Sequence, residues 1–164
     1  MAAPELPALS LLHPYRGTDF QPLYTTAVTV RGGVSGHGRA SGVARSDDGC
    51  LALELRLPRA LGGAGGGTNP EQLFAAGYAA CFHGALRLLA QRARIRAAGA
   101  TVQATVAFGR DPVDGAYALT ARLQVRLPGL ERAAAEALVR DAERLCPYAK
   151  MVRNGLAGTI TLVR

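Results

Sequence analysis

The sequence contains no tryptophan, and its 164 residues include only five tyrosines and four phenylalanines. Nearly half of the residues are nevertheless apolar (49 %), so alanine, leucine and valine must form most of any hydrophobic core. A chain of this length can bury one such core. We therefore expect a single domain over residues 22–164. Residues 1–21 contain three prolines, which favours an N-terminal extension that is extended or disordered over one that is helical.

Targeting and membrane-spanning signals are also missing. The N-terminus has no basic segment followed by an apolar core, and we find no apolar run that reaches the length of a bilayer span. These two absences predict a soluble cytoplasmic protein that does not bind membranes.

Lysine is almost absent, because 18 of the 19 basic residues are arginine and only Lys150 is lysine. A phosphate-binding loop requires a lysine after its last glycine, and the glycine-rich run that ends in Gly66-Gly67-Thr68 has none. The net charge of +7 permits nucleic-acid binding, but most of the arginines are scattered singly and no recognition motif accompanies them. We therefore expect no nucleic-acid partner and keep a basic nucleic-acid-associated protein only as an alternative.

The three cysteines, Cys50, Cys81 and Cys146, lack the paired spacing of a zinc site, and no histidines cluster beside them. In a reducing cytosol a disulfide framework is also disfavoured. Packing and redox chemistry remain as their two possible roles. For Cys50 we predict packing.

Hydrophobic periodicity predicts an α+β fold with antiparallel sheets and two main helices. An Asp47-Asp48-Gly49 turn and a second turn at residues 111–115 predict two hairpins. The expected strands are Tyr24–Arg31, Arg39–Arg45, Cys50–Leu57, Thr101–Phe108, Ala116–Leu127 and Thr159–Val163. The expected helices begin near residues 69 and 130, and the second ends at Cys146 because Pro147 cannot continue it.

The central helix has two alternative start signals. Asn69 can cap it with Pro70 as its first residue, or Thr68 can cap it with Glu71 closing a capping box. No breaker follows until past Arg94, so the helix should have about six turns or more. From the residues alone, Cys81 within this apolar run is an ordinary small core residue.

Longer motifs change that interpretation, because they resemble the organic hydroperoxide resistance proteins of the OsmC-like superfamily. The resemblance rests on the unbroken string from Thr68 to Phe82, on Glu54–Gly67, on Leu127-Pro128-Gly129-Leu130 and on Cys146-Pro147-Tyr148. It implies the OsmC-like fold in an intertwined homodimer. It also implies a thiol peroxidase that reduces organic or fatty-acid hydroperoxides to alcohols.

The same resemblance assigns roles to four residues. Cys81 corresponds to the cysteine that attacks the peroxide and Cys146 to the cysteine that then forms a disulfide with it. Glu71 corresponds to the glutamate that holds a catalytic arginine, for which Arg39 is our choice. The implied reductant is an external dithiol, such as the dihydrolipoyl group of a lipoylated protein, and neither a metal nor a bound organic cofactor is implied.

Three points stay open at this stage. The loop that carries the arginine is longer than the family pattern, so Arg31 and Arg45 remain candidates beside Arg39. Ten helical residues separate Glu71 from Cys81, about 15 Å along a straight axis, so either the helix breaks near Gly77 or the carboxylate acts beside a partner's cysteine. A ligand carrier with the same fold and an apolar pocket is the alternative function.

Overall fold

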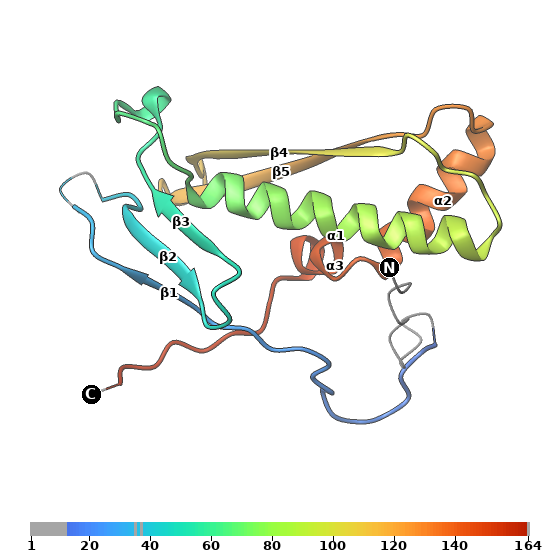
Figure 1. The fold of residues 1–164 in the computed structure, drawn as a ribbon, viewed down its shortest axis with the longest axis horizontal. Coiled ribbons are helices and arrows are strands. Elements are labelled where there is room, and N and C mark those ends of the chain that lie inside the picture. Colours follow the sequence, from blue (N-terminus) through green and yellow to red (C-terminus); the bar gives the residue numbers. More distant parts are fainter. Residues whose placement is uncertain (1–12, 35, 37, 164) are drawn as a thin grey trace.

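The computed structural model describes residues 13–34, 36 and 38–163. Within them, two antiparallel sheets and three α-helices confirm the predicted α+β class (Figure 1). The N-terminal extension lies partly outside the described residues, and residues 13–21 form no helix or strand. The elements are β1 (Val28–Arg31), β2 (Gly42–Ser46), β3 (Ala52–Leu55), the short 3₁₀ helix η1 (Arg59–Leu61), α1 (Pro70–Arg92), β4 (Thr101–Arg110), β5 (Tyr117–Arg126), α2 (Arg132–Leu145) and α3 (Pro147–Asn154).

The first sheet has the order β1-β2-β3, with Val43 opposite Arg31 on one side and Glu54 on the other. Its strands are shorter than predicted, because the backbone turns at Gly42 (φ 98°) and leaves residues 39–41 outside the ladder. Backbone hydrogen bonds join Thr68 to Glu54 and Arg56, which fixes the start of α1 against β3. Gly67 permits this approach, since a Cβ there would lie 2.8 Å from the Glu54 carbonyl oxygen.

Asn69 caps α1, and its side chain accepts a hydrogen bond of 2.9 Å from the backbone N–H of Gln72. Of the two predicted start signals, the Asn69–Pro70 cap is therefore confirmed. The capping box does not form, since the Thr68 N–H donates to Glu54 instead, and Glu71 is left to other contacts. The helix then runs as one 23-residue element, which confirms the predicted long helix and excludes the alternative of a break near Gly77.

One face of α1 forms the centre of the core. Tyr78, Phe82, Leu86 and Ala90 follow one another at four-residue steps and are all buried. They pack with Leu138 and Ala142 of α2 and with partly buried side chains of the β4–β5 sheet. In Figure 1 the long β4–β5 hairpin runs alongside α1, α2 crosses the C-terminal half of α1, and α3 lies on the side of α1 away from the hairpin.

The same helix is long and apolar enough to cross a membrane by length and composition, which corrects the statement that no segment reaches that length. Core helices pass the same test. Within the chain, 22 % of its most apolar stretch is buried, so much of the helix surface remains uncovered by the chain's own residues.

Two features of the C-terminal region differ from prediction. Pro147 does end α2, but it also begins the separate helix α3, as its fixed φ suits a first helical residue. The predicted strand Thr159–Val163 does not form in the described chain. Those residues are exposed, with Ile160 and Leu162 more than 90 % accessible, and they pair with neither of the two sheets.

Candidate active site

Cys81 and Cys146 meet at the contact between α1 and the α2–α3 junction. Their Sγ atoms lie 3.5 Å apart although 65 residues separate them in sequence. Cys146 is fully buried, whereas Cys81 is partly exposed. A disulfide places its sulfurs about 2.05 Å apart, so a shift of about 1.5 Å would join the two. The structure brings these two predicted site residues together.

The N-terminus of α3 provides hydrogen bonds to both sulfurs. Cys146 is the N-cap residue, and its Sγ accepts from the backbone N–H of Ala149 at 3.5 Å. Burial raises the pKa of the Cys81 thiol, and hydrogen bonding from the Tyr148 backbone offsets part of this rise. The neighbouring Cys146 adds to the rise of the Cys81 pKa. The helix N-terminus is therefore the local feature that favours a Cys81 thiolate.

Aromatic side chains form one wall beside this cysteine pair. The rings of Phe74, Tyr78 and Tyr148 lie 6.1 to 6.2 Å from one another. Gly77 allows Tyr148 to lie against α1, since a Cβ at that position would be 2.7 Å from the Tyr148 hydroxyl. Tyr78 is at the same time part of the buried core, as is Phe82 one turn further along α1.

Arg39 and Glu71 form a second pair at the start of α1. The Arg39 guanidinium donates to the Glu71 carboxylate, and both side chains are mostly buried, with accessibilities of 23 % and 16 %. The Arg39 guanidinium carbon also lies 3.8 Å from the centre of the Phe108 ring on β4. The structure thus joins the predicted arginine to the predicted glutamate.

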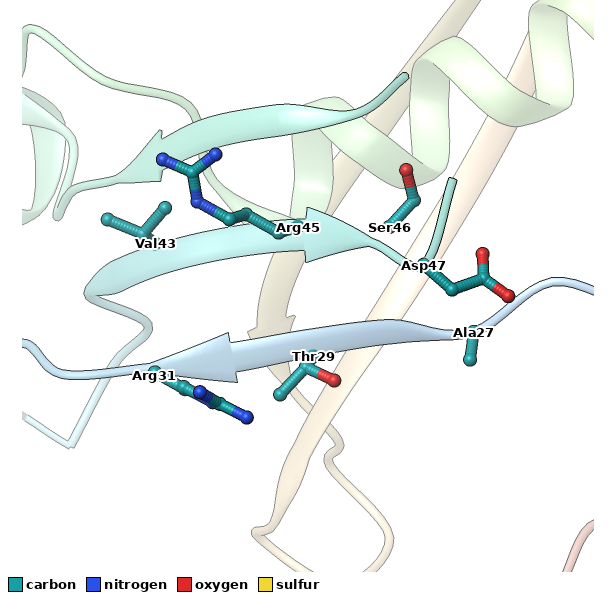
Figure 2. A pocket seen from close by; sticks show the side chains of 7 residues that line it. All are labelled: Ala27, Thr29, Arg31, Val43, Arg45, Ser46 and Asp47. Carbon is teal, nitrogen blue, oxygen red and sulfur yellow. The ribbon is translucent and has the colours of Figure 1, made fainter. Parts of the chain in front are cut away.

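The two rival arginines lie elsewhere. Arg31 on β1 and Arg45 on β2 line a separate hollow of about 390 Å³ on the first sheet, together with Thr29, Val43 and the turn residue Asp47 (Figure 2). Both side chains are exposed. In the described part of the chain, neither forms an ion pair with Glu71.

The two pairs are separate within one chain. Because α1 is unbroken, Glu71 precedes Cys81 by about 15 Å along the helix axis. Among the described residues, no cation contributes to the pKa of Cys81. The Arg39–Glu71 pair therefore lies too far along α1 to contact Cys81 of its own chain.

Cys50 belongs to neither pair. It is exposed in the β2–β3 turn, where its N–H donates to the Asp48 carboxylate at 2.9 Å. The prediction that Cys50 is a packing residue is therefore wrong, because Cys50 lies in the exposed turn and β3 begins only at Ala52. Within the described residues, no group of three or more histidine, cysteine, aspartate or glutamate side chains could hold a metal ion.

Sequence reasoning missed two contributors to these pairs. The sequence does contain a signal for the α3 N-terminus, because proline, here Pro147, is favoured at the first position of a helix. The contact of Phe108 with Arg39 had no local signal, because Arg39 lies in the β1–β2 loop, Phe108 lies on β4 and 69 positions separate them.

Comparison with known proteins agrees with this architecture. The family model described as OsmC-like protein matches residues 63–161, a range that includes both cysteines and Glu71. The fold and this family match thus define an OsmC-like protein.

More specific relatives narrow the assignment. The organic hydroperoxide resistance protein of Xanthomonas axonopodis pv. citri is 41 % identical over 142 residues, which cover 85 % of this chain and 94 % of the relative. OhrB of Bacillus subtilis is 40 % identical over 134 residues, which cover 82 % of this chain and 93 % of OhrB. The crystal structure of an organic hydroperoxide resistance protein from Legionella pneumophila superposes with a TM-score of 0.72 at 41 % identity, covering 82 % of this chain and 93 % of that one. The chain belongs to the organic hydroperoxide resistance family of OsmC-like proteins.

Proposed function

We propose that the protein is a two-cysteine peroxidase that reduces organic hydroperoxides to alcohols. Membership of a family named for organic hydroperoxide resistance supports a role in peroxide resistance. The observation that carries the enzymatic proposal is the 3.5 Å separation of the Cys81 and Cys146 sulfurs. Two thiols at contact distance, one accessible and one buried, suit a nucleophile and a resolving cysteine.

The proposed reaction has three steps. The Cys81 thiolate attacks the terminal oxygen of the hydroperoxide, the O–O bond breaks, and the alkoxide takes a proton to leave as the alcohol. Cys81 is then a sulfenic acid, and the Cys146 thiol attacks it so that a disulfide forms and water leaves. An external dithiol, for which a dihydrolipoyl group is our choice, reduces the disulfide and is itself oxidised to a disulfide.

A cation near Cys81 would favour both the thiolate and the charge that develops on the leaving oxygen. We propose that Arg39, held by Glu71, supplies it from the partner subunit of a homodimer. The long separation of Glu71 and Cys81 along α1 supports this arrangement over one within a single chain.

The first test of the proposal is the disulfide itself. One equivalent of cumene hydroperoxide added to reduced protein should produce an intramolecular disulfide between Cys81 and Cys146, because their sulfurs already touch. Peptide mapping under non-reducing conditions identifies the bond. A disulfide that contains Cys50 in place of either residue would contradict the proposal.

Several apolar surfaces of the chain support the homodimer. Much of α1 is uncovered, Val28 and Val30 on β1 are each at least half exposed, and the C-terminal segment exposes Ile160, Leu162 and Val163. Exposed apolar area of this kind marks interaction surfaces in folded proteins. A second copy of the chain, related by a two-fold axis, would cover the same surfaces on both subunits.

We therefore predict an obligate dimer. The melting temperature should rise with protein concentration, since dimer formation stabilises the folded state by mass action. Sedimentation velocity at several dilutions, run beside thermal melts, measures both quantities. A folded monomer that still consumes hydroperoxide at nanomolar concentration would refute the prediction.

A further inference from the structure

Three elements that are distant in sequence hold the Arg39 side chain. Arg39 lies in the loop between β1 and β2, Glu71 lies on the first turn of α1, and Phe108 lies on β4 of the other sheet. The carboxylate accepts a hydrogen bond from Nη2 at the edge of the guanidinium, whereas the guanidinium carbon lies over the Phe108 ring, 3.8 Å from its centre. Together they restrict both the position and the tilt of the guanidinium plane.

A second aromatic ring supports the first. Phe108 pairs with Leu119 across the β4–β5 ladder, so Tyr117 is its diagonal neighbour on the same face. The two rings are stacked with centres 4.9 Å apart and an interplanar angle of 24°. Arg110 in turn lies 4.2 Å from the Tyr117 ring centre and donates to the Tyr117 hydroxyl at 3.2 Å. Phe108 is thus held in place by its own hairpin.

We propose that Phe108 is a positioning residue, whose ring, backed by Tyr117, holds the Arg39 guanidinium in the orientation that the peroxidase reaction requires. The inference rests on the proposed function of Arg39 and adds a supporting residue from the β4–β5 sheet. It has a physical basis in the attraction between a guanidinium and the negative face of an aromatic ring, which strengthens as the pair is shielded from water. The low exposure of Arg39 provides that shielding.

The β1–β2 loop that carries Arg39 is irregular, so the contact with Phe108 matters for the orientation of the side chain. Residues 32–41 contain several glycines and form no regular structure where they are described, so the loop backbone by itself does not fix Arg39. An ion pair by itself leaves a long side chain with residual freedom about the carboxylate axis. The ring restricts that freedom.

Phe108 also lines a hollow of about 310 Å³ with Leu57, Leu61, Tyr117 and Arg39 itself. A ring in that place could instead serve as a wall for the apolar part of a substrate. The two roles predict different kinetics. Loss of a wall should affect bulky hydroperoxides most and act through KM, whereas loss of Arg39 orientation should lower kcat/KM equally for tert-butyl and cumene hydroperoxide.

The experiment compares Phe108→Leu, which removes the ring, with Phe108→Tyr, which keeps it. The matched control is Val106→Ala. Val106 lies on the same face of β4, two residues away, and the structure records no contact between it and Arg39, so the substitution removes apolar volume only. We expect Phe108→Leu to lower kcat/KM roughly tenfold for both hydroperoxides. For Phe108→Tyr and Val106→Ala, kcat/KM should stay within about twofold of the parent value, a margin that corresponds to a small change in activation free energy.

A spectroscopic readout tests the contact without any enzymatic assay. Protons of the Arg39 side chain should resonate upfield through the ring current of Phe108, and this shift should vanish in Phe108→Leu and persist in Phe108→Tyr. If Phe108→Leu melts below the assay temperature, Phe108→Met replaces it, since methionine keeps a long apolar side chain without a ring.

The outcomes separate the inference from the proposed function. If the parent protein shows the upfield shift but consumes no hydroperoxide, the peroxidase proposal fails while the contact stands. If the parent protein is active and Phe108→Leu is equally active, the positioning role is refuted. In the Arg39→Ala background Phe108→Leu should cost nothing more, and a full additional tenfold loss would likewise overturn the inference.

Discussion

Serine in place of Cys81 is expected to abolish hydroperoxide reduction, with a fall of about 10⁴-fold or more in kcat/KM, because Cys146, the other thiol of the pair, is fully buried and does not meet the peroxide. A serine hydroxyl has almost the same size as the thiol but does not ionise near neutral pH, so the change removes the chemistry and leaves the packing. Consumption of cumene hydroperoxide in the presence of dihydrolipoamide is the measurement.

Two further cysteine variants make this prediction specific. Cys50→Ser is the matched control, since Cys50 is exposed in the β2–β3 turn, and it should retain full activity. Cys146→Ser should still react with one equivalent of hydroperoxide, and it should accumulate a Cys81 sulfenic acid that dimedone traps. Activity in Cys81→Ser, or inactivity in Cys50→Ser, would show that the wrong cysteine has been assigned.

Local signals in the sequence predicted most elements of the fold. Asn69 and Pro70 place the start of α1, and the alternating residues around the turn at 111–115 place β4 and β5. These features depend on neighbours within a few positions, which a sequence displays directly. The strand expected at Thr159–Val163 does not form. A strand must pair with another strand, and the local sequence does not show whether the fold provides one.

The candidate site was predictable only in part. Composition and periodicity describe Cys81 as a core residue, and its pairing with Cys146 came from the family resemblance. Among the three arginines the sequence favoured Arg39 but left Arg31 and Arg45 possible, because the lengthened loop makes its alignment with the family pattern ambiguous. The fold separates the three, since only the segment at Arg39 passes beside the first turn of α1.

Removal of the Arg39 guanidinium is the second change for which we expect a large effect. Arg39→Ala should raise the pKa of Cys81 further above its usual value and slow hydroperoxide reduction by about 10²-fold or more, the scale of losing one transition-state charge stabiliser. Burial already raises the Cys81 pKa within one chain, so the rate of Cys81 alkylation should reach its plateau at a higher pH in the variant. Arg31→Ala and Arg45→Ala are the matched controls and should leave both quantities nearly unchanged, since their side chains line a different hollow.

Mixed dimers test which subunit supplies the arginine. If Arg39 acts on Cys81 of the partner subunit, a dimer of one Cys81→Ser chain and one Arg39→Ala chain contains one site with both defects and one intact site. Co-refolding the two variants, each nearly inactive alone, should then restore about a quarter of the parent activity, because random pairing puts half of the chains in mixed dimers with one intact site of two. If Arg39 acts within its own chain, every site in the mixture keeps one defect and no activity returns.

Recovery in this mixture, together with none from Cys81→Ser mixed with Cys146→Ser, would place the cysteine pair on one subunit and the Arg39–Glu71 pair on the other. The 15 Å that separates Glu71 from Cys81 along α1 leads us to expect that result.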